Sequence, residues 1–148
     1  MKEHEIVGTT NIGIGGMPGL SEMTLESVKV FVEKFNEVAR KIHKHGFKLT
    51  YHNHHWEFAK HSGVRIMDYL ADNLDKDATS FVLDTHWVQA GGGDVIDWMK
   101  KLAGRIDILH LKDYKIENGE RAFAEIYEGN INFDGVLKTA EEIGVKHY

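Results

Sequence analysis

The sequence predicts an α/β fold with a mostly parallel sheet, and three features of the chain support this expectation. Strand-like and helix-like segments alternate along its 148 residues. Two strand-like segments, 81–83 and 106–111, are continuous apolar runs, as expected of parallel strands that helices cover. Polar side chains follow such runs, and the chemistry of parallel α/β proteins gathers at the carboxyl ends of the strands.

The first part of the chain predicts two strands separated by a loop and a long helix. We expect a short strand over 5–9 and then a glycine-rich loop over 11–19. Thr24 is a suitable N-cap for a helix whose apolar residues keep helical spacing until Gly46 ends it. A strand over 48–51 follows and leads into a histidine-rich segment.

The rest of the chain continues the alternation. We expect, in order, a helix, a strand, a helix capped by Asp94, a strand, a helix and the start of a last strand, over residues 64–74, 81–84, 95–102, 106–111, 134–143 and 145–148. The triple glycine 91–93 is expected to form a tight turn, because it lacks the flanking Lys-Ser/Thr of a nucleotide-binding loop. No Pro/Ser-rich linker divides the chain, so we expect a single domain over 1–148.

Composition narrows the classes of partner. The chain is 42% hydrophobic and 28% charged, with a formal net charge of −5. This acidic balance, without a dense Lys/Arg cluster, argues against nucleic acid, and no apolar run is long enough to span a membrane. There is no cysteine, which excludes disulfides and thiolate metal sites. The amino terminus lacks the apolar core of a signal peptide, so we expect a cytoplasmic protein.

The segment 51–58, Tyr-His-Asn-His-His-Trp-Glu-Phe, places three imidazoles and a carboxylate at the end of a predicted strand. Side chains two residues apart on a strand share a face, so His52 and His54 are expected to point the same way. Asp84 ends the next apolar strand, and His110 lies at the end of the one after it. A lone histidine in an apolar strand is more often a core residue than a ligand. Three such side chains at one sheet edge predict instead that His52, Asp84 and His110 bind a divalent metal.

Four segments in order, YHNHHWEF, FVLDTHWVQAGGGD, LHLKD and EGNINF, resemble the sugar phosphate isomerase/epimerase superfamily, whose members have the xylose isomerase-like TIM barrel and include inosose dehydratases. The resemblance covers nearly the whole chain. It implies a divalent ion, Mn²⁺, Co²⁺, Mg²⁺ or Zn²⁺, at the barrel mouth. Asp84 and His110 match ligand positions of the family. His52 stands where many members have a glutamate, which leaves His54 and Glu57 as alternative ligands.

The length of the chain predicts a partial barrel. A complete (β/α)₈ barrel takes about 250 residues, whereas this chain of 148 residues supplies about five candidate parallel strands. The resemblance implies that the N-terminal βα units and the end of the last strand are missing, together with a glutamate that completes the metal site in relatives. An open parallel sheet has unpaired edges, so we expect a homo-oligomer that forms through them.

The resemblance also implies a reaction and a substrate class. We expect isomerisation, epimerisation or inosose-type dehydration of a sugar, sugar phosphate or polyol through a metal-stabilised enediolate. Glu57 is the candidate base, and Lys112 is a candidate to neutralise an oxyanion or phosphate. The candidate substrate-binding residues are His54, Trp87, Asp113, Glu128 and Asn130. Asp113 is also a candidate to orient a histidine. The structural alternatives are core packing for Trp87 and an ion pair between Lys112 and Asp113 at the barrel rim.

Two other functions stay open at this point. A noncatalytic partial barrel would serve as a binding or assembly module. A metallohydrolase on the same barrel, such as an endonuclease, shares the metal chemistry but needs a basic groove, which this acidic chain does not show.

Overall fold

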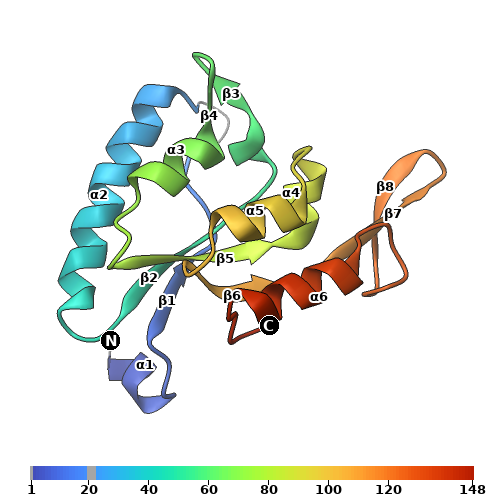
Figure 1. The fold of residues 1–148 in the computed structure, drawn as a ribbon. Coiled ribbons are helices and arrows are strands. Elements are labelled where there is room, and N and C mark those ends of the chain that lie inside the picture. The colour runs from blue at the N-terminus through green and yellow to red at the C-terminus, as the bar shows by residue number, and fades with distance from the viewer. Residues whose placement is uncertain (1, 20–22) are drawn as a thin grey trace.

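A four-stranded sheet in the order β1-β2-β5-β6 forms the centre of the computed structural model, which describes residues 2–19 and 23–148 (Figure 1). Each neighbouring pair of strands is parallel. The strands are β1 (Asn11–Ile14), β2 (Lys48–His52), β5 (Thr79–Asp84) and β6 (Ile106–His110). The predicted parallel α/β fold is therefore confirmed, and over the described residues the sheet does not close into a barrel.

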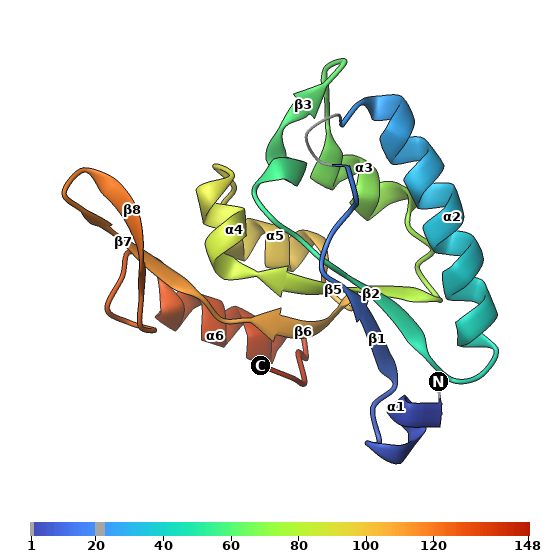
Figure 2. The same ribbon diagram turned by 180° about the vertical axis from the view of Figure 1, so that it is seen from behind.

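The helices that follow the strands lie on one side of this sheet, whereas the reverse view shows β1 and β6 nearest the viewer (Figures 1 and 2). They are α2 (Leu25–His43), α3 (Ile66–Asn73), α4 (Thr85–Ala90), α5 (Val95–Lys101) and α6 (Phe133–Glu142). The longest, α2, begins with the predicted cap, where Thr24 and Ser27 form a reciprocal capping box. The apolar stripe of α2 is buried against the sheet, so the core lies between the helices and the strands.

Strand alternation separates the core from the candidate site. The Tyr51 ring packs against Phe31 and Phe35 of α2, with ring centroids 5.8 and 6.1 Å apart. Because side chains alternate along a strand, Thr50 and His52 point to the opposite face of the sheet from Tyr51. The same α2 contacts that bury Tyr51 therefore direct His52 away from the apolar core.

The predicted strand over 5–9 is wrong, and so is the loop that was expected to begin at residue 11. Residues of this segment form the short helix α1 (Lys2–Ile6), in which Ile6 is 83% exposed. The strand is β1, whose Gly13 lies beside Thr50 of β2. A Cβ atom at Gly13 would lie 3.1 Å from the Thr50 hydroxyl, so glycine permits this close pairing. Apolar character at Ile6 and Val7 misled the expectation, since neither side chain is buried.

Several short elements were not predicted. The predicted helix over 64–74 starts only at Ile66, because 64–65 form β4 (Val64–Arg65), which pairs with β3 (Lys60–His61) after the 3₁₀ helix η2 (Trp56–Phe58). Helix α4 directly follows β5. The expected last strand over 145–148 is reduced to a single bridge between Ile108 and His147.

A β-hairpin after β6 also escaped prediction. It consists of β7 (Asp113–Glu117) and β8 (Glu120–Ala124), and it projects from the body of the molecule in both views (Figures 1 and 2). Its turn is Asn118-Gly119, with positive φ angles of 53° and 82°. Asn-Gly with two positive φ angles is the preferred two-residue hairpin turn.

The triple glycine forms a tight turn, as predicted. Gly91 is the C-cap of α4, and Gly92 has a φ of +80°. A Cβ atom at Gly91 or Gly93 would lie 2.5 or 2.7 Å from the ring of Phe58, so the turn packs directly on that side chain.

Within the described ranges, no helix combines the length and the apolar character needed to cross a membrane.

Candidate metal centre

Three side chains meet at the carboxyl ends of β2, β5 and β6. Asp84 Oδ2 lies 3.2 Å from His52 Nε2 and 2.9 Å from His110 Nδ1. The two histidine nitrogens are 3.2 Å apart. Since the three strands are parallel, their last residues share one sheet edge, and the sequence prediction that this edge brings His52, Asp84 and His110 together agrees with the geometry.

Hydrogen bonds alone do not account for all three contacts. Asp84 Oδ2 is an acceptor, and each facing histidine nitrogen either carries a proton or offers a lone pair. If both nitrogens donate to Asp84, two N–H groups face each other across 3.2 Å. If one of them is unprotonated, its lone pair faces the carboxylate oxygen. A cation between the three atoms satisfies all of them at once, so the residues fit a divalent ion.

The Asp84 carboxylate is fully buried and firmly oriented. Its second oxygen, Oδ1, accepts the Trp87 backbone N–H at 3.1 Å and so caps α4. The Asp84 backbone N–H donates to Asn53 Oδ1 at 2.8 Å. Oδ1 of Asp84 therefore serves as a helix cap, whereas Oδ2 is free to bind an ion beside His52 and His110. Sequence reasoning singled out neither of these contacts, and Asn53 carries no sequence signal beyond its place next to His52.

Thr85 is a second positioning residue that sequence reasoning missed. Its buried hydroxyl donates to the Lys112 carbonyl at 2.7 Å and accepts the Lys112 N–H at 3.0 Å. The His110 carbonyl lies 3.4 Å from the same hydroxyl. Thr85 therefore ties the chain after β6 to the end of β5, next to Asp84 and His110.

Replacing this hydroxyl gives a testable prediction. We expect Thr85→Val to lower the free energy of unfolding by about 2 kcal/mol, because the Lys112 N–H and C=O lose a buried partner. We also expect apparent metal affinity to fall about tenfold, as for other groups that orient ligands. Urea unfolding and calorimetric metal titration measure the two effects. Thr85→Ser keeps the hydroxyl and should stay near wild type; equal losses in both variants would contradict the role of the hydroxyl.

Glu57 lies inside the protein. It has no exposed surface, its Oε1 accepts the Tyr51 hydroxyl at 2.5 Å, and its Oε2 accepts the His54 N–H at 2.9 Å. Burial raises the pKa of Glu57 above its ordinary value, although these hydrogen bonds partly oppose the shift. Both oxygens are therefore occupied in fixing the segment after β2, and this placement favours a positioning role over proton transfer.

The raised pKa of Glu57 predicts a specific dependence of stability on pH. A carboxyl with a higher pKa in the folded state binds more protons when folded, so its contribution to stability declines as pH rises through the folded pKa. We therefore expect wild type to lose unfolding free energy relative to Glu57→Gln as pH rises above the ordinary glutamate pKa of about 4.5. Urea unfolding at several pH values measures this. A pH-independent difference between the two proteins would show that burial does not perturb this carboxyl.

Aromatic rings form a wall beside the three converging side chains. The His54 ring centroid lies 4.8 Å from that of His52 and 5.5 Å from that of Trp87. His55 stacks between Trp56 and Trp87, with centroid distances of 3.8 and 5.0 Å. The structure thus places His54 and Trp87 next to the site, and the wall offers flat apolar surface of the kind that sugar rings pack against.

Lys112 is held at the far side of this wall. Its ammonium lies 4.6 Å from the Trp87 ring centroid and 4.2 Å from that of Phe123, which the unpredicted hairpin supplies. Such contacts are attractive because the negative faces of the aromatic rings meet the cation. The alternative of a rim ion pair between Lys112 and Asp113 does not appear among the ion pairs of the described residues. Phe123 could have been found from the Asn118-Gly119 turn signal.

The remaining predicted residues are Asp113, at the start of β7, and two residues of the loop after the hairpin, Glu128 and Asn130. Asp113 is fully buried and accepts backbone N–H groups from Tyr114, Gly129 and Ile131 at 2.8, 3.1 and 3.2 Å. It therefore holds the loop that carries Glu128 and Asn130, both of which are exposed. The structure does not bring these two side chains into the group formed by His52, Asp84 and His110.

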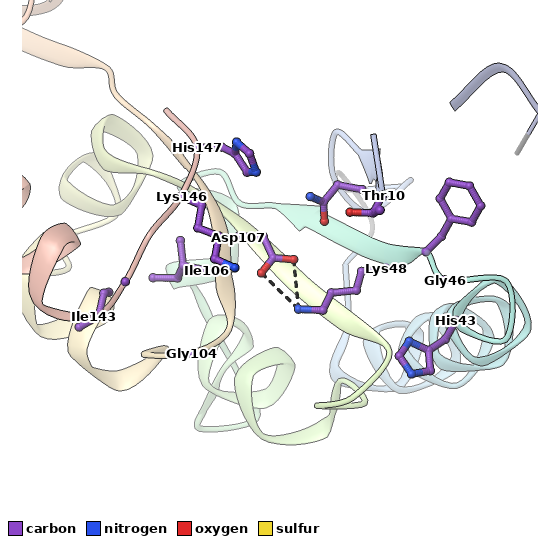
Figure 3. Close-up of a pocket in the computed structure, with 13 residues that line it drawn as sticks. Thr10, His43, Gly46, Lys48, Gly104, Ile106, Asp107, Ile143, Lys146 and His147 are labelled. Carbon is purple, nitrogen blue, oxygen red and sulfur yellow. Dashed lines mark hydrogen bonds and ion pairs between the residues drawn. The ribbon is translucent and has the colours of Figure 1, made fainter. Parts of the chain in front are cut away.

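A cavity of about 500 Å³ lies at the opposite, amino-terminal edge of the sheet (Figure 3). Lys48 at the start of β2 and Asp107 of β6 form an ion pair of 3.2 Å in it, and His147 and Thr10 also line it. The cavity is remote in the fold from the strand ends that carry the metal ligands. Cavity volume alone does not identify a metal site. The candidate site therefore remains at the strand ends, where the metal-ligating atoms converge.

The chain matches the family model described as "Xylose isomerase-like TIM barrel" over residues 5–148. It is 24% identical to an inosose dehydratase of Clostridium perfringens, with 83% of this chain and 46% of that protein covered. An inosose dehydratase of Mesomycoplasma hyopneumoniae is 23% identical, with 88% and 42% covered.

Solved structures give the same result. A sugar phosphate isomerase/epimerase from Parabacteroides distasonis superposes with a TM-score of 0.81 at 28% identity, covering 98% of this chain and 51% of that one. The chain therefore spans about half the length of the relatives it matches. The family model extends over nearly all of the sequence, and the resemblance inferred from the four segments is confirmed. The chain belongs to the xylose isomerase-like TIM barrel family.

Proposed function

We propose that this protein is a metal-dependent enzyme of sugar or polyol metabolism that acts by removing a proton next to a carbonyl group. The observation that carries the proposal is the convergence of His52, Asp84 and His110 with atom separations of 2.9 to 3.2 Å. The names of the relatives, inosose dehydratase and sugar phosphate isomerase/epimerase, support a carbohydrate substrate.

Each residue of the site has a proposed role. His52, Asp84 and His110 would hold the divalent ion, which acts as a Lewis acid and stabilises the enediolate charge that develops beside the carbonyl. The imidazole of His54 would accept the proton that leaves the substrate carbon, because burial lowers the pKa of His54 and favours the neutral form. His54 and Trp87 line the side of the site and orient the substrate. Their aromatic surface excludes water from one flank of it. We propose that Glu128 and Asn130 contact the substrate from the exposed loop, and that the buried Asp113 supports this binding by holding the loop in place.

Lys112 is proposed to neutralise negative charge on the substrate. Its ammonium is held between Trp87 and Phe123. Burial lowers the pKa of His54, and the positive charge of Lys112 adds a smaller lowering effect. Glu57 was expected to be the base, and its burial and its two hydrogen bonds favour positioning of His54 instead. On this proposal Glu57→Gln keeps most of the turnover, whereas a loss of more than about 100-fold would restore the role of general base.

Exchange of substrate hydrogen with solvent tests the proposed function. Isomerisation, epimerisation and inosose dehydration all begin by removing a proton next to a carbonyl, so each should incorporate deuterium at that carbon in heavy water. We expect NMR to detect this exchange with a panel of ketoses and inososes when the protein carries a divalent ion. Asp84→Asn, which removes a metal ligand, should show none. No exchange with any substrate by metal-loaded wild type would contradict enzymatic activity.

A noncatalytic binding or assembly module is the second candidate. The observation that favours it is the open sheet, in which β1 and β6 form the edges over the described residues apart from the Ile108–His147 bridge. Metal binding without any hydrogen exchange would support this alternative. We also propose that the open edges promote self-association, which light scattering after size-exclusion chromatography measures; a monomer at all concentrations would contradict it.

A further inference from the structure

We propose that the cavity at the amino-terminal edge of the sheet binds a small organic anion, such as a phosphate monoester that carries an apolar group. The cavity has a volume of about 500 Å³ (Figure 3), and ligand pockets commonly have volumes of about 300–1,000 Å³. It lies at the edge of the sheet opposite to the candidate metal centre, so the inference goes beyond the proposed function and does not depend on it.

Basic side chains outnumber acidic ones around this cavity, although the chain as a whole is acidic, with 23 Asp and Glu against 18 Lys and Arg. Two lysines and two histidines line the cavity beside a single carboxylate, in a set that consists of Lys48, Lys146, His43, His147 and Asp107. Figure 3 shows the Lys48–Asp107 ion pair between His43 of α2 on one side and Lys146 and His147 on the other. The lining therefore has the opposite charge balance to the chain as a whole.

Asp107 is already neutralised by Lys48. Each of its oxygens lies 3.2 Å from the Lys48 ammonium, so neither is left to hold a metal ion. Lys146 takes part in none of the ion pairs found in the part of the chain that the structure describes. Its ammonium is thus the charge with which an incoming anion pairs, and the imidazoles of His43 and His147 supply further N–H donors.

Three helices, α2, α5 and α6, end at the rim of the cavity. Carbonyl groups at a helix C-terminus carry partial negative charge and repel an anion that they face. Backbone N–H groups of the following turns satisfy such carbonyls here at 2.8 to 2.9 Å, in the pairs Gly46 to His43, Arg105 to Leu102 and Val145 to Ala140. These carbonyl groups are bonded within their own turns, which leaves the ammonium and imidazole groups to interact with a ligand.

The lining also favours an organic anion over a bare inorganic ion. Phe47 and Ile106 line the cavity with side chains that are only 4% and 5% exposed, so they form a fixed apolar surface. Asn11 lines it as well, and its buried Oδ1 accepts no hydrogen bond from the described residues. A ligand with an apolar group can pack on the first two side chains, and a hydroxyl group on the ligand would satisfy Asn11.

Calorimetric titration of the chelator-treated whole chain with phenyl phosphate tests the proposal. We expect saturable binding with a Kd of about 1 mM or lower. Inorganic phosphate should bind at least about tenfold more weakly, because it has no phenyl ring to remove from water. Benzyl alcohol, which has the ring without the charge, should also bind at least about tenfold more weakly. NMR locates the ligand, since the amide signals of Gly46, Gly104 and Gly144 at the cavity should shift.

Two variants of the ion pair should change affinity in opposite directions. Asp107→Asn removes the negative charge and frees the Lys48 ammonium, so it should tighten phenyl phosphate binding by about fivefold. Misfolding cannot produce such a gain. Lys48→Gln leaves Asp107 as an unpaired negative charge in the cavity, so it should remove measurable binding.

A matched pair of lysine variants tests the free charge. Lys146→Gln should weaken phenyl phosphate binding by about two- to fivefold, as expected of an exposed ion pair. Lys34→Gln removes an exposed lysine of α2 that does not line the cavity, and it should leave the Kd unchanged.

The outcomes keep this inference apart from the proposed function. If phenyl phosphate shows no saturable binding, the inference is overturned and the metal centre is unaffected. If Lys112→Gln abolishes binding while Lys146→Gln and Asp107→Asn do not change it, the anion occupies the opposite edge of the sheet and the inference is again overturned. If inorganic phosphate binds as tightly as phenyl phosphate, the assignment to an organic anion is overturned.

Discussion

Asp84→Asn is expected to abolish ion-induced stabilisation while leaving the metal-free protein folded. The amide oxygen of asparagine can still cap α4 through the Trp87 N–H, as Asp84 Oδ1 does. It supplies no negative charge to an ion beside His52 and His110. We expect metal affinity to fall by more than about 100-fold, because removal of groups that only orient ligands already costs 10–100-fold. Calorimetry and Tm measurements with and without Co²⁺ check this.

Asp84→Ala separates the two tasks of this side chain. It should lose both the ion and the helix cap, so its metal-free form should be less stable than Asp84→Asn by about 1 kcal/mol. If Asp84→Asn still shows the full rise in Tm with Co²⁺, the ion binds elsewhere. If Asp84→Ala and Asp84→Asn are equally stable without metal, the capping contact makes no net contribution.

Gly129→Ala is expected to destabilise the fold more than other loop substitutions in this protein. A Cβ atom at Gly129 would lie within 3.0 Å of Asp113 Oδ1 and of the Tyr114 carbonyl oxygen, which is backbone and has little freedom to move. The substitution also presses on the carboxylate that accepts N–H groups from Gly129 and Ile131. We expect a loss of about 3 kcal/mol or more in unfolding free energy, measured by urea denaturation.

Gly15→Ala is the matched control for this substitution. Gly15 has no atom within 4 Å of the position of a new Cβ, and its φ is not in the left-handed region. We therefore expect a change within about 0.5 kcal/mol. A similar loss of unfolding free energy in both variants would contradict the close contact between Gly129 and Asp113. If Gly129→Ala is as stable as wild type, the loop shifts to make room for the methyl group without cost.

The elements that sequence reasoning predicted well are those that the core determines. Helix α2 has a capping residue, a continuous apolar stripe and a glycine after its end, and its observed bounds follow these signals. Strands β5 and β6 are apolar runs buried by helices. The convergence at the candidate site could be predicted because parallel strands place their carboxyl ends at one edge, whatever the details of the loops.

The errors have local physical causes. Ile6 and Val7 suggested a buried strand, but burial is decided by what packs on a side chain, and both are exposed. The hairpin escaped because its strands are largely polar and exposed, so periodicity was weak. The Asn118-Gly119 pair would have predicted it.

The roles of side chains other than the three candidate metal ligands depend on tertiary contacts, which no sequence motif predicts. Glu57 looks like an available carboxylate in the sequence, yet the Tyr51 hydroxyl, six residues earlier, holds it in the interior. Asp113 likewise accepts hydrogen bonds from backbone N–H groups near residue 130. These groups are too far along the chain for the sequence pattern to predict the contact. Thr85 acts through its neighbours' backbone and has no sequence signature.

Anomalous X-ray diffraction from crystals of the Co²⁺-loaded protein tests the central claim most directly. We predict one strong cobalt peak within about 2.0–2.2 Å of His52 Nε2, Asp84 Oδ2 and His110 Nδ1. Absence of a peak at this sheet edge, or a peak only at exposed histidines such as His43 and His45, would contradict the account.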